Sequence, residues 1–464
     1  MMQHLLRISG GVSNRSANTV PEKPSRSSWH RAITACLAAV VLVLTGCQSS
    51  PPQSSAPTSA PVSTSAFPST EAGKAMEWIH TVLEQDADVA EGDVEGRFSQ
   101  EFTAEVPPTE LVSLFNENLR PAAPFEVTDY AGDELTSSAT FTGSEGDPFV
   151  VQIAVDADGT INGLLFTPEN DHEEATTLED AEARLDELPI DVNYLVTSGE
   201  KNIAASGEQD VAPIGSAFKL WVLLAVVNSI DDGSLNWNDE LTVEASNKSL
   251  PSGDLQNLPD GSTVTVREAA QKMIEISDNT ATDLLIGAVG REKVDALVPE
   301  HMRPVATTRQ FFELVWGEGS DRLGEYSEAD EQGRAKILDS LEDLTVSATD
   351  VDMDTSKVSA PTWAASPEEV ADIWEQLDSA SEQHPELDEI LGANTAVSVS
   401  GYNNLWFKGG SLPGVLAGSW TGETESGDRV TVVLIASSDD ATAVNDNTME
   451  LLLLGGDILT LLAS

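Results

Sequence analysis

Two residues of complementary chemistry, Ser216 and Lys219, stand at the start of a very apolar segment. Gly215-Ser216-Ala217-Phe218-Lys219 runs into Leu220–Val227, which is apolar on every side. A helix without a polar face is expected to be buried. Residues three apart share one helix face, and a lysine removed from water can lose its proton near neutral pH. The spacing therefore predicts a nucleophile, Ser216, with Lys219 as the base that activates it.

The chain contains the same spacing a second time, in Ser198-Gly199-Glu200-Lys201. This copy falls in a glycine-containing turn between two expected strands, where nothing fixes the serine against the lysine. The helical context, and not the spacing alone, favours the pair at 216 and 219.

Two further motifs follow along the chain. Ser277-Asp278-Asn279 comes directly after a helix whose start is indicated by the capping box Thr265-Val266-Arg267-Glu268. Lys408-Gly409-Gly410-Ser411 stands at the close of an expected strand. In this order and on these element types, the three motifs resemble those of the serine β-lactamase and D,D-peptidase superfamily, the penicillin-recognising serine hydrolases.

The resemblance covers about residues 175 to 464 and implies a role for each matching residue. Ser216 would attack a carbonyl and become acylated, while Lys219 would take its proton. Ser277 would relay a proton to the leaving group. Asp278 is expected to brace its loop.

The same resemblance implies a set of substrate-binding residues. Asn279 would bond to the substrate or to Lys219, Lys408 would attract a substrate carboxylate, and the N–H groups of Ser216 and Ser411 would form the oxyanion hole. The expected substrate-binding set is Asn279, Lys408, Gly409, Gly410 and Ser411.

The sequence departs from the family pattern in two places. Gly409 stands where the family usually has threonine, which removes a hydroxyl from the floor of the site. Efficient β-lactamases also carry a glutamate, in a Glu-x-x-x-Asn type motif, that activates the deacylating water. Here the corresponding region, 307–314, offers only Glu313 without that asparagine, so we expect Glu313 to be an ordinary helix residue and β-lactam adducts to be released poorly.

The first 70 residues read as export and anchoring signals. Basic residues precede an apolar run from Ala32 to Gly46, typical of a signal peptide over 1–46, and Leu44-Thr45-Gly46-Cys47 resembles the bacterial lipobox. Lipidation of Cys47 is therefore expected, with 47–70, rich in Ser, Pro and Thr, as a tether. These features predict a lipid-anchored protein on the extracytoplasmic face of the cell membrane.

Residues 71–170 form the first expected domain. The apolar pattern predicts helix from Glu71 to about Glu105 and a second helix opened by Pro107-Pro108. Alternating runs at 125–130, 136–142, 148–155 and 160–166 predict a curved antiparallel sheet. The pattern resembles small cone-shaped α+β folds of cyclases and isomerases. Together with the Thr-Thr-Arg-x-Phe-Phe stretch at 307–312, it is similar to the clavam-biosynthesis type of serine hydrolase and its actinobacterial lipoprotein relatives.

Residues 175–464 form the second expected domain. A helix near 178–187 and a strand near 192–197 precede a long helical region. Strands return only at 396–400, 404–408, 414–420 and 429–437, before a final helix around 449–462. A sheet built from both ends of a domain around an all-helical insert predicts an α/β sandwich within an α+β fold class.

Composition excludes several function classes. The formal net charge of -54 disfavours nucleic acid as a partner. The two cysteines, Cys36 and Cys47, both precede the expected domains, and no H-x-x-x-H or H-E-x-x-H pair occurs, so neither a metal nor a cofactor is expected.

Three functions remain open on the sequence alone. The first is a serine hydrolase of acyl, ester or amide bonds with weak or no β-lactamase turnover. The second is a D,D-carboxypeptidase-like enzyme acting on peptidoglycan-like peptides. The third is a catalytically silent binding lipoprotein, which the intact set of reactive residues disfavours.

Overall fold

The computed structural model describes residues 67–463, apart from 86, 100–101, 104–105, 145–147, 169–171, 208–209, 342–344, 348–349, 352–353 and 359–362. The predicted signal peptide, the predicted lipidation site Cys47 and the tether up to residue 66 lie outside the described residues. Within them, no helix is both long and apolar enough to cross a membrane.

The first helix, α2 (Glu71–Glu84), begins at the cap Thr70 and buries the predicted face around Met76 and Ile79. The prediction of helix as far as residue 105 is wrong. Helix α2 ends at Glu84, and among the described residues between it and Gly96, whose φ of 73° is left-handed, only α3 (Glu91–Val94) is helical.

The second predicted helix starts at Pro108, as expected for a proline in the first turn. This helix, α5 (Pro108–Ser113), continues as the π-helix η1 (Leu114–Leu119) and the 3₁₀ turn η2 (Arg120–Ala122).

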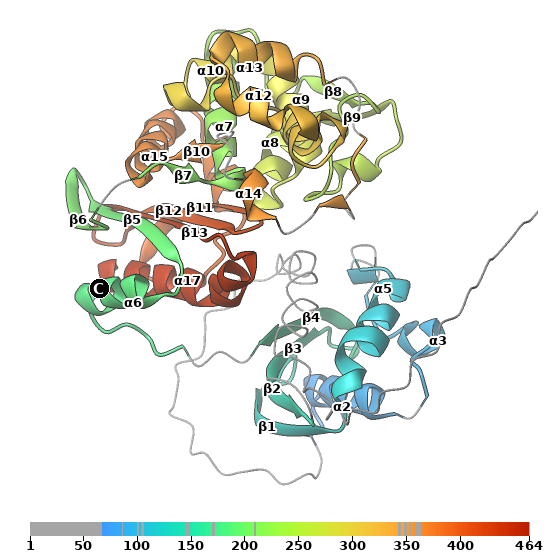
Figure 1. The fold of residues 1–464 in the computed structure, drawn as a ribbon. Coiled ribbons are helices and arrows are strands. Elements are labelled where there is room, and N and C mark those ends of the chain that lie inside the picture. The colour runs from blue at the N-terminus through green and yellow to red at the C-terminus, as the bar shows by residue number, and fades with distance from the viewer. Residues whose placement is uncertain are drawn as a thin grey trace, which may run out of the picture.

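The four predicted alternating runs are confirmed as one antiparallel sheet of order β1-β2-β3-β4 (Figure 1). Helix α2 packs on this sheet, and both contribute to one hydrophobic core that includes Phe115, Phe141 and Phe149. The strands are β1 (Phe125–Gly132), β2 (Thr136–Gly143), β3 (Phe149–Val155) and β4 (Ile161–Pro168).

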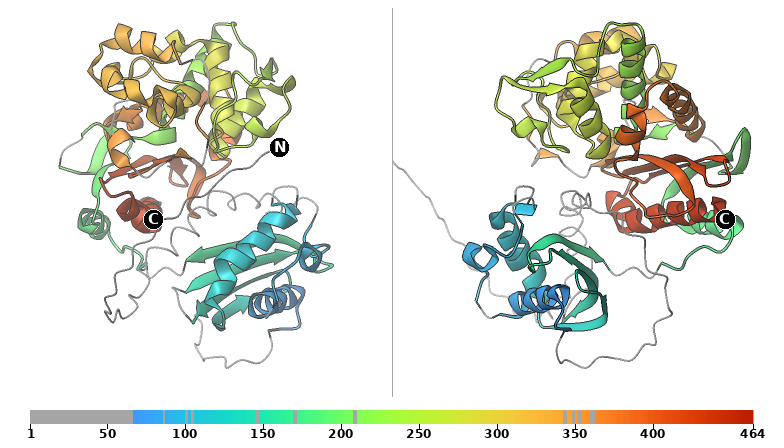
Figure 2. Two further views of the ribbon diagram at one scale, coloured as in Figure 1. Left: turned by 45° about the vertical axis from the view of Figure 1, so that its right-hand side comes forward. Right: turned by 180° about the vertical axis from the view of Figure 1, so that it is seen from behind.

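A larger sheet, of order β11-β12-β13-β5-β6, draws its strands from two distant parts of the chain. Its members are β5 (Asp191–Ser198), β6 (Lys201–Ala205), β11 (Tyr402–Leu412), β12 (Val415–Thr424) and β13 (Arg429–Ser437). Helices α6 (Leu178–Glu187) and α17 (Ala441–Leu462) cover one face, and the helical insert covers the other (Figures 1 and 2). The predicted α+β fold class, with a sandwich around a helical insert, is therefore confirmed.

The strand predicted at 396–400 is wrong, because this segment is a loop. Ala396 has a left-handed φ of 58°, and the carbonyl of Thr395 accepts bonds from Val397 N and Trp420 Nε1. Val397 and Val399 pack on the core beneath α17, so burial in a loop produced the apolar alternation that resembled a strand.

The helical insert is organised around α7 (Lys219–Asp231), whose apolar side chains are nearly all buried, as predicted. The capping box Thr265/Glu268 at the start of α8 is also confirmed. Other helices of the insert are α8 (Val266–Glu275), α9 (Asn279–Val289), α10 (Arg291–Asp295), α11 (Thr308–Val315), α15 (Pro367–Ser381) and α16 (Glu386–Gly392).

The acidic segment 325–354, whose role the sequence left open, folds partly onto this insert. Helices α12 (Leu323–Glu328) and α13 (Glu331–Leu338) bury Tyr326 and Leu338 in the insert's core. The short α14 (Thr355–Val358) follows. Thr355 lies against Gly414 of the β11–β12 turn, and its Oγ1 donates to Asp439 O, just after β13, at 2.8 Å.

Candidate active site

Ser216 lies in a tight turn at the edge of the larger sheet. The 3₁₀ turn η3 (Gly215–Phe218) directly precedes α7, so Ser216 stands one turn before the regular helix and Lys219 is its first residue. Gly215 has a left-handed φ of 49°, and a Cβ there would lie 2.8 Å from Ser411 N. Glycine is thus needed for the turn to approach β11.

Strand β11 packs directly against this turn. A Cβ on Gly410 would lie 2.0 Å from Ile214 O and 2.7 Å from Ser216 N, so only glycine allows this contact. The backbones of Ser216 and Ser411 are therefore brought together, as an oxyanion hole built from their N–H groups requires.

The Lys219 amine is fully buried and donates to three acceptors. These are Ser277 O, Ser277 Oγ at 3.1 Å and Asn279 Oδ1 at 2.8 Å. Three acceptors match the three N–H bonds of an ammonium, so the pocket is prepared for the cation that forms when Lys219 takes a proton. Burial, and then the nearby charge of Lys408, hold the pKa of Lys219 well below 10.5, against the opposing influence of Asp278 and Asp283.

Lys408, on strand β11, contacts the Ser277 hydroxyl from the side of the sheet. Its Nζ donates to Ser277 Oγ at 3.0 Å and to Gly409 O at 2.9 Å, and the residue is 3% exposed. Burial lowers its pKa from 10.5 to about 7. Among the described residues, neither Lys219 nor Lys408 forms an ion pair with a carboxylate, so two buried amines share the site without a carboxylate bonded to either.

The Ser277 hydroxyl is therefore the point where the two lysines converge. Ser277 has a left-handed φ of 58°, and Asp278 is the N-cap of α9. The Asp278 carboxylate accepts from the backbone N–H groups of Ala281, Asp254 and Leu255 at 2.7 to 2.9 Å. This confirms the bracing role expected for Asp278.

Gly409, which replaces the usual threonine, lies beside an aromatic ring. A Cβ at this position would come within 2.9 Å of Phe407 Cζ. Phe407 in turn contacts Trp420, with ring centroids 5.0 Å apart. A larger side chain at 409 would have to move this ring.

Glu313 contacts a different part of the molecule. Its carboxylate accepts from Gly319 N at 3.1 Å and from Thr345 N at 2.9 Å, and the side chain is buried at the end of α11. These contacts join the end of α11 to the 3₁₀ helix at Glu318–Arg322 and to the loop at Thr345, which agrees with the prediction that Glu313 is a structural residue.

Sequence reasoning missed two polar residues next to the predicted site. Asp283, one turn beyond Asn279, is buried, which raises its pKa to about 6, and it accepts from Thr308 N at 2.7 Å at the start of α11. Ser252 donates to Ser277 O at 2.8 Å. Asp283 could have been flagged by its position on the face of Asn279, whereas Ser252 lies in a Pro-Ser-Gly turn without a motif.

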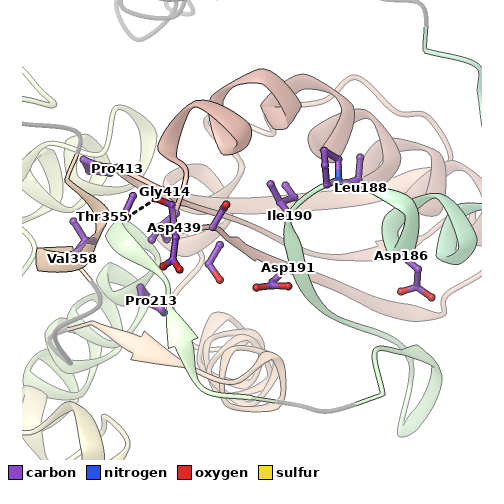
Figure 3. Close-up of a pocket in the computed structure, with 14 residues that line it drawn as sticks. Asp186, Leu188, Ile190, Asp191, Pro213, Thr355, Val358, Pro413, Gly414 and Asp439 are labelled. Carbon is purple, nitrogen blue, oxygen red and sulfur yellow. Dashed lines mark hydrogen bonds between the residues drawn. The ribbon is translucent and has the colours of Figure 1, made fainter.

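A cavity of about 540 Å³ lies at one end of the larger sheet (Figure 3). Pro213, α14 and the β11–β12 turn form one side, and the segment entering β5 forms the other. None of the predicted site residues lines it. Among the described residues, no group of three or more His, Cys, Asp or Glu side chains is arranged to hold a metal ion.

Comparisons with known proteins agree with this architecture. Residues 67–161 match the family model described as "ORF 12 gene product N-terminal", and residues 178–395 match the model of the "Beta-lactamase enzyme family". Comparison with curated proteins gives no match.

Comparison with solved structures finds matches among penicillin-binding and β-lactamase proteins. The structure of PBP-A is 16% identical and covers 61% of this chain and 93% of its own, with a TM-score of 0.42. The β-lactamase from Sphaerobacter thermophilus is 19% identical, covering 60% and 97%, with a TM-score of 0.40. A β-lactamase from Xanthomonas campestris pv. campestris is 15% identical, covering 61% and 97%, with a TM-score of 0.43.

The family model ends before β11, and the buried Lys408 of that strand meets the Ser277 motif from outside the matched segment. Through residues 178–395, this chain is similar to the β-lactamase enzyme family, which supports the predicted resemblance to the serine β-lactamases and D,D-peptidases.

Proposed function

We propose that this protein is a lipid-anchored, extracytoplasmic serine hydrolase that cleaves acyl, ester or amide bonds through an acyl-enzyme on Ser216. One observation carries the proposal: the Ser277 hydroxyl lies 3.1 Å from the buried amine of Lys219 and 3.0 Å from that of Lys408. A structural serine has no need of two buried amines without carboxylate partners.

The proposed reaction begins with proton transfer. Neutral Lys219 takes the proton of Ser216 Oγ as that oxygen bonds to the substrate carbonyl carbon. The resulting ammonium already has its three acceptors on Ser277 and Asn279. The oxyanion that forms on the substrate is stabilised by the N–H groups of Ser216 and Ser411.

The leaving group then departs with a proton. Ser277 donates its hydroxyl proton to the leaving atom and recovers one from the Lys219 ammonium, which returns Lys219 to the neutral state. Lys408 attracts a carboxylate on the leaving-group side of the substrate. The product of this half-reaction is an ester between the acyl group and Ser216.

Slow release of that ester from β-lactam adducts is part of the proposal. Hydrolysis of the acyl-enzyme needs a base that activates water, and the Glu313 carboxylate is occupied by Gly319 and Thr345. Gly409 also provides no hydroxyl to orient a bound carboxylate. These features support weak or no β-lactamase turnover.

Acylation can be tested directly with a fluorophosphonate probe and a panel of β-lactams, read by intact-mass spectrometry. The wild-type protein should gain the mass of one adduct, and Ser216→Ala should gain none. Ser198→Ala is the matched control and should be labelled like wild type. Equal labelling of wild type and Ser216→Ala would remove Ser216 from its proposed role.

The proposed location has its own test. Full-length protein expressed in a bacterial host should partition into the detergent phase, and Cys47→Ser should move to the aqueous phase. Equal partitioning of the two would contradict lipidation of Cys47.

A D,D-carboxypeptidase-like activity is the second candidate, because the buried Lys408 suits the terminal carboxylate of a peptide. Release of D-alanine from a peptidoglycan-type pentapeptide by wild type, and its absence with Ser216→Ala, would support it. No release at high enzyme concentration would leave the general hydrolase.

A further inference from the structure

The backbone carbonyl of Ser277 receives two donors from different parts of the chain. One is the amine of Lys219, and the other is the hydroxyl of Ser252 at 2.8 Å. A carbonyl oxygen has two lone pairs, so these two donors fill its capacity. The oxygen that receives the Lys219 amine is thus shared with an exposed residue that no motif includes.

Ser252 belongs to a segment that precedes the Ser277 motif in the sequence and packs closely against it in the structure. Asn279 N donates to Ser252 O at 3.0 Å, and Asn279 Nδ2 donates to Leu250 O at 2.9 Å. The N–H groups of Asp254 and Leu255 bond to the Asp278 carboxylate. Residues 250–255 are therefore fixed beside residues 277–279, which holds the Ser252 hydroxyl against the Ser277 carbonyl.

Sharing the carbonyl affects the balance between the two forms of Lys219. The charged groups around its amine are Lys408 on β11, which disfavours the ammonium, and Asp278 and Asp283 on and beside α9, which favour it. A carbonyl that already accepts from Ser252 is a weaker acceptor for the ammonium than a free one. Ser252 therefore restrains the Ser277 backbone and limits the stabilisation of charged Lys219.

We propose that Ser252 is a positioning residue for the acylation step: by sharing the Ser277 carbonyl with Lys219, its hydroxyl sets the position and proton affinity of that amine and the direction of the Ser277 hydroxyl. The inference rests on the proposed function, since it concerns the same proton transfers. Ser252 acts through Ser277 and Lys219 and forms no bond with the substrate.

The test compares Ser252→Ala, Ser252→Thr and Ser262→Ala in the full-length protein. Ser262 is the matched control, because its hydroxyl also donates to a backbone carbonyl, that of Pro259, at 2.7 Å, at the start of the short strand β9 (Ser262–Thr265). The rate of fluorophosphonate labelling is measured from pH 5 to 9 at several probe concentrations, which separates the maximal acylation rate from probe binding. Thermal unfolding of each variant shows whether it folds.

Loss of the Ser252 hydroxyl should lower the maximal acylation rate about tenfold, in line with one hydrogen bond of about 1 to 1.5 kcal/mol. The acidic limb of the pH profile should move to higher pH, because the freed carbonyl favours charged Lys219. Probe binding should not change. Ser252→Thr, which keeps a hydroxyl, should restore most of the rate, and Ser262→Ala should behave as wild type.

Two results would overturn the inference while leaving the hydrolase intact: a wild-type pH profile and rate in Ser252→Ala, or equal losses in Ser252→Ala and Ser252→Thr. A loss of unfolding temperature in Ser252→Ala without a change in the pH profile would assign the residue a purely structural role and also overturn it. A wild-type protein that no probe acylates would overturn the inference and the proposed function together.

Discussion

The molecule contains one sequence pattern in two physical settings. Ser216 and Lys219 stand at the start of a buried helix, and the lysine is fully enclosed with three acceptors. Ser198 and Lys201 form a cross-strand pair at the tip of the β5–β6 hairpin, with Lys201 exposed. The same two residue types at the same spacing therefore differ in solvation, partners and geometry.

Enclosure, and not spacing, gives a lysine the properties of a base. An exposed ammonium keeps its hydration and stays charged at neutral pH, whereas burial beside a second lysine disfavours the charged form.

The largest effect should come from removing the lysines themselves. Lys219→Ala should lower the acylation rate by roughly 10² to 10⁴-fold, the usual contribution of a general base. Lys201→Ala should leave the rate unchanged, because its side chain lies in solvent at the hairpin. Labelling kinetics with the fluorophosphonate probe measure both, and similar rates in the two variants would contradict the assignment of Lys219.

The next largest effect should come from the glycines beside the two serine–lysine pairs. Gly215 and Gly199 both have a left-handed φ, but a Cβ on Gly215 would lie 2.8 Å from Ser411 N, whereas one on Gly199 would meet nothing within 4 Å. We expect Gly215→Ala to cost roughly 3 kcal/mol and to reduce acylation, because the turn must move away from β11. Gly199→Ala should cost only about 1 kcal/mol, the penalty for the backbone conformation alone.

Denaturant unfolding and probe labelling of both variants measure this difference. Equal stabilities and unchanged labelling would show that the approach of β11 to Gly215 is not needed for the site.

Much of the fold was accessible from the sequence because its signals were local. Strict alternation located β1 to β4, the capping box located α8, and the apolar run located α7. Errors arose where tertiary packing decided the outcome. Val397 and Val399 alternate because a loop packs on the core, and no local rule separates that from a strand.

The candidate site was only partly predictable for a related reason. The motifs gave the residue types, but the convergence of Lys219 and Lys408 on Ser277 depends on three segments far apart in the chain. Ser252 could not be found, because its contact with Ser277 joins residues 25 positions apart through a turn without a recognisable signal.

The buried Lys408 should also differ from an exposed lysine in how substrate binding depends on pH. Burial lowers the pKa of Lys408 to about 7, so its charged fraction should fall from about one half at pH 7 to about one tenth at pH 8. Binding of a substrate with a carboxylate should therefore weaken up to about fivefold from pH 7 to 8, while a neutral ester of similar size should show no such change.

The same shift predicts a stability effect of opposite direction. Since the folded-state pKa lies below the unfolded value of 10.5, the unfolded state binds more protons between the two, and stability should rise with pH over that interval. Lys408→Arg stays charged and should remove the difference between the two substrates. A ratio of KM values for the charged and neutral substrates that stays constant across pH 6 to 9 would contradict a titrating Lys408.

The smallest effect is expected at Glu313. Like Lys201, it is a residue of a type used in catalysis whose surroundings in the structure do not favour a catalytic role. Its carboxylate bonds to Gly319 and Thr345, so Glu313→Gln should cost about 1 kcal/mol of stability by weakening those charge-assisted bonds. The lifetime of a β-lactam acyl-enzyme, followed by intact mass, should equal that of wild type. If Glu313 were the deacylating base, its replacement by glutamine would lengthen the lifetime of the adduct many-fold. A longer-lived adduct in Glu313→Gln would therefore show that this glutamate acts on the ester, despite its contacts with Gly319 and Thr345.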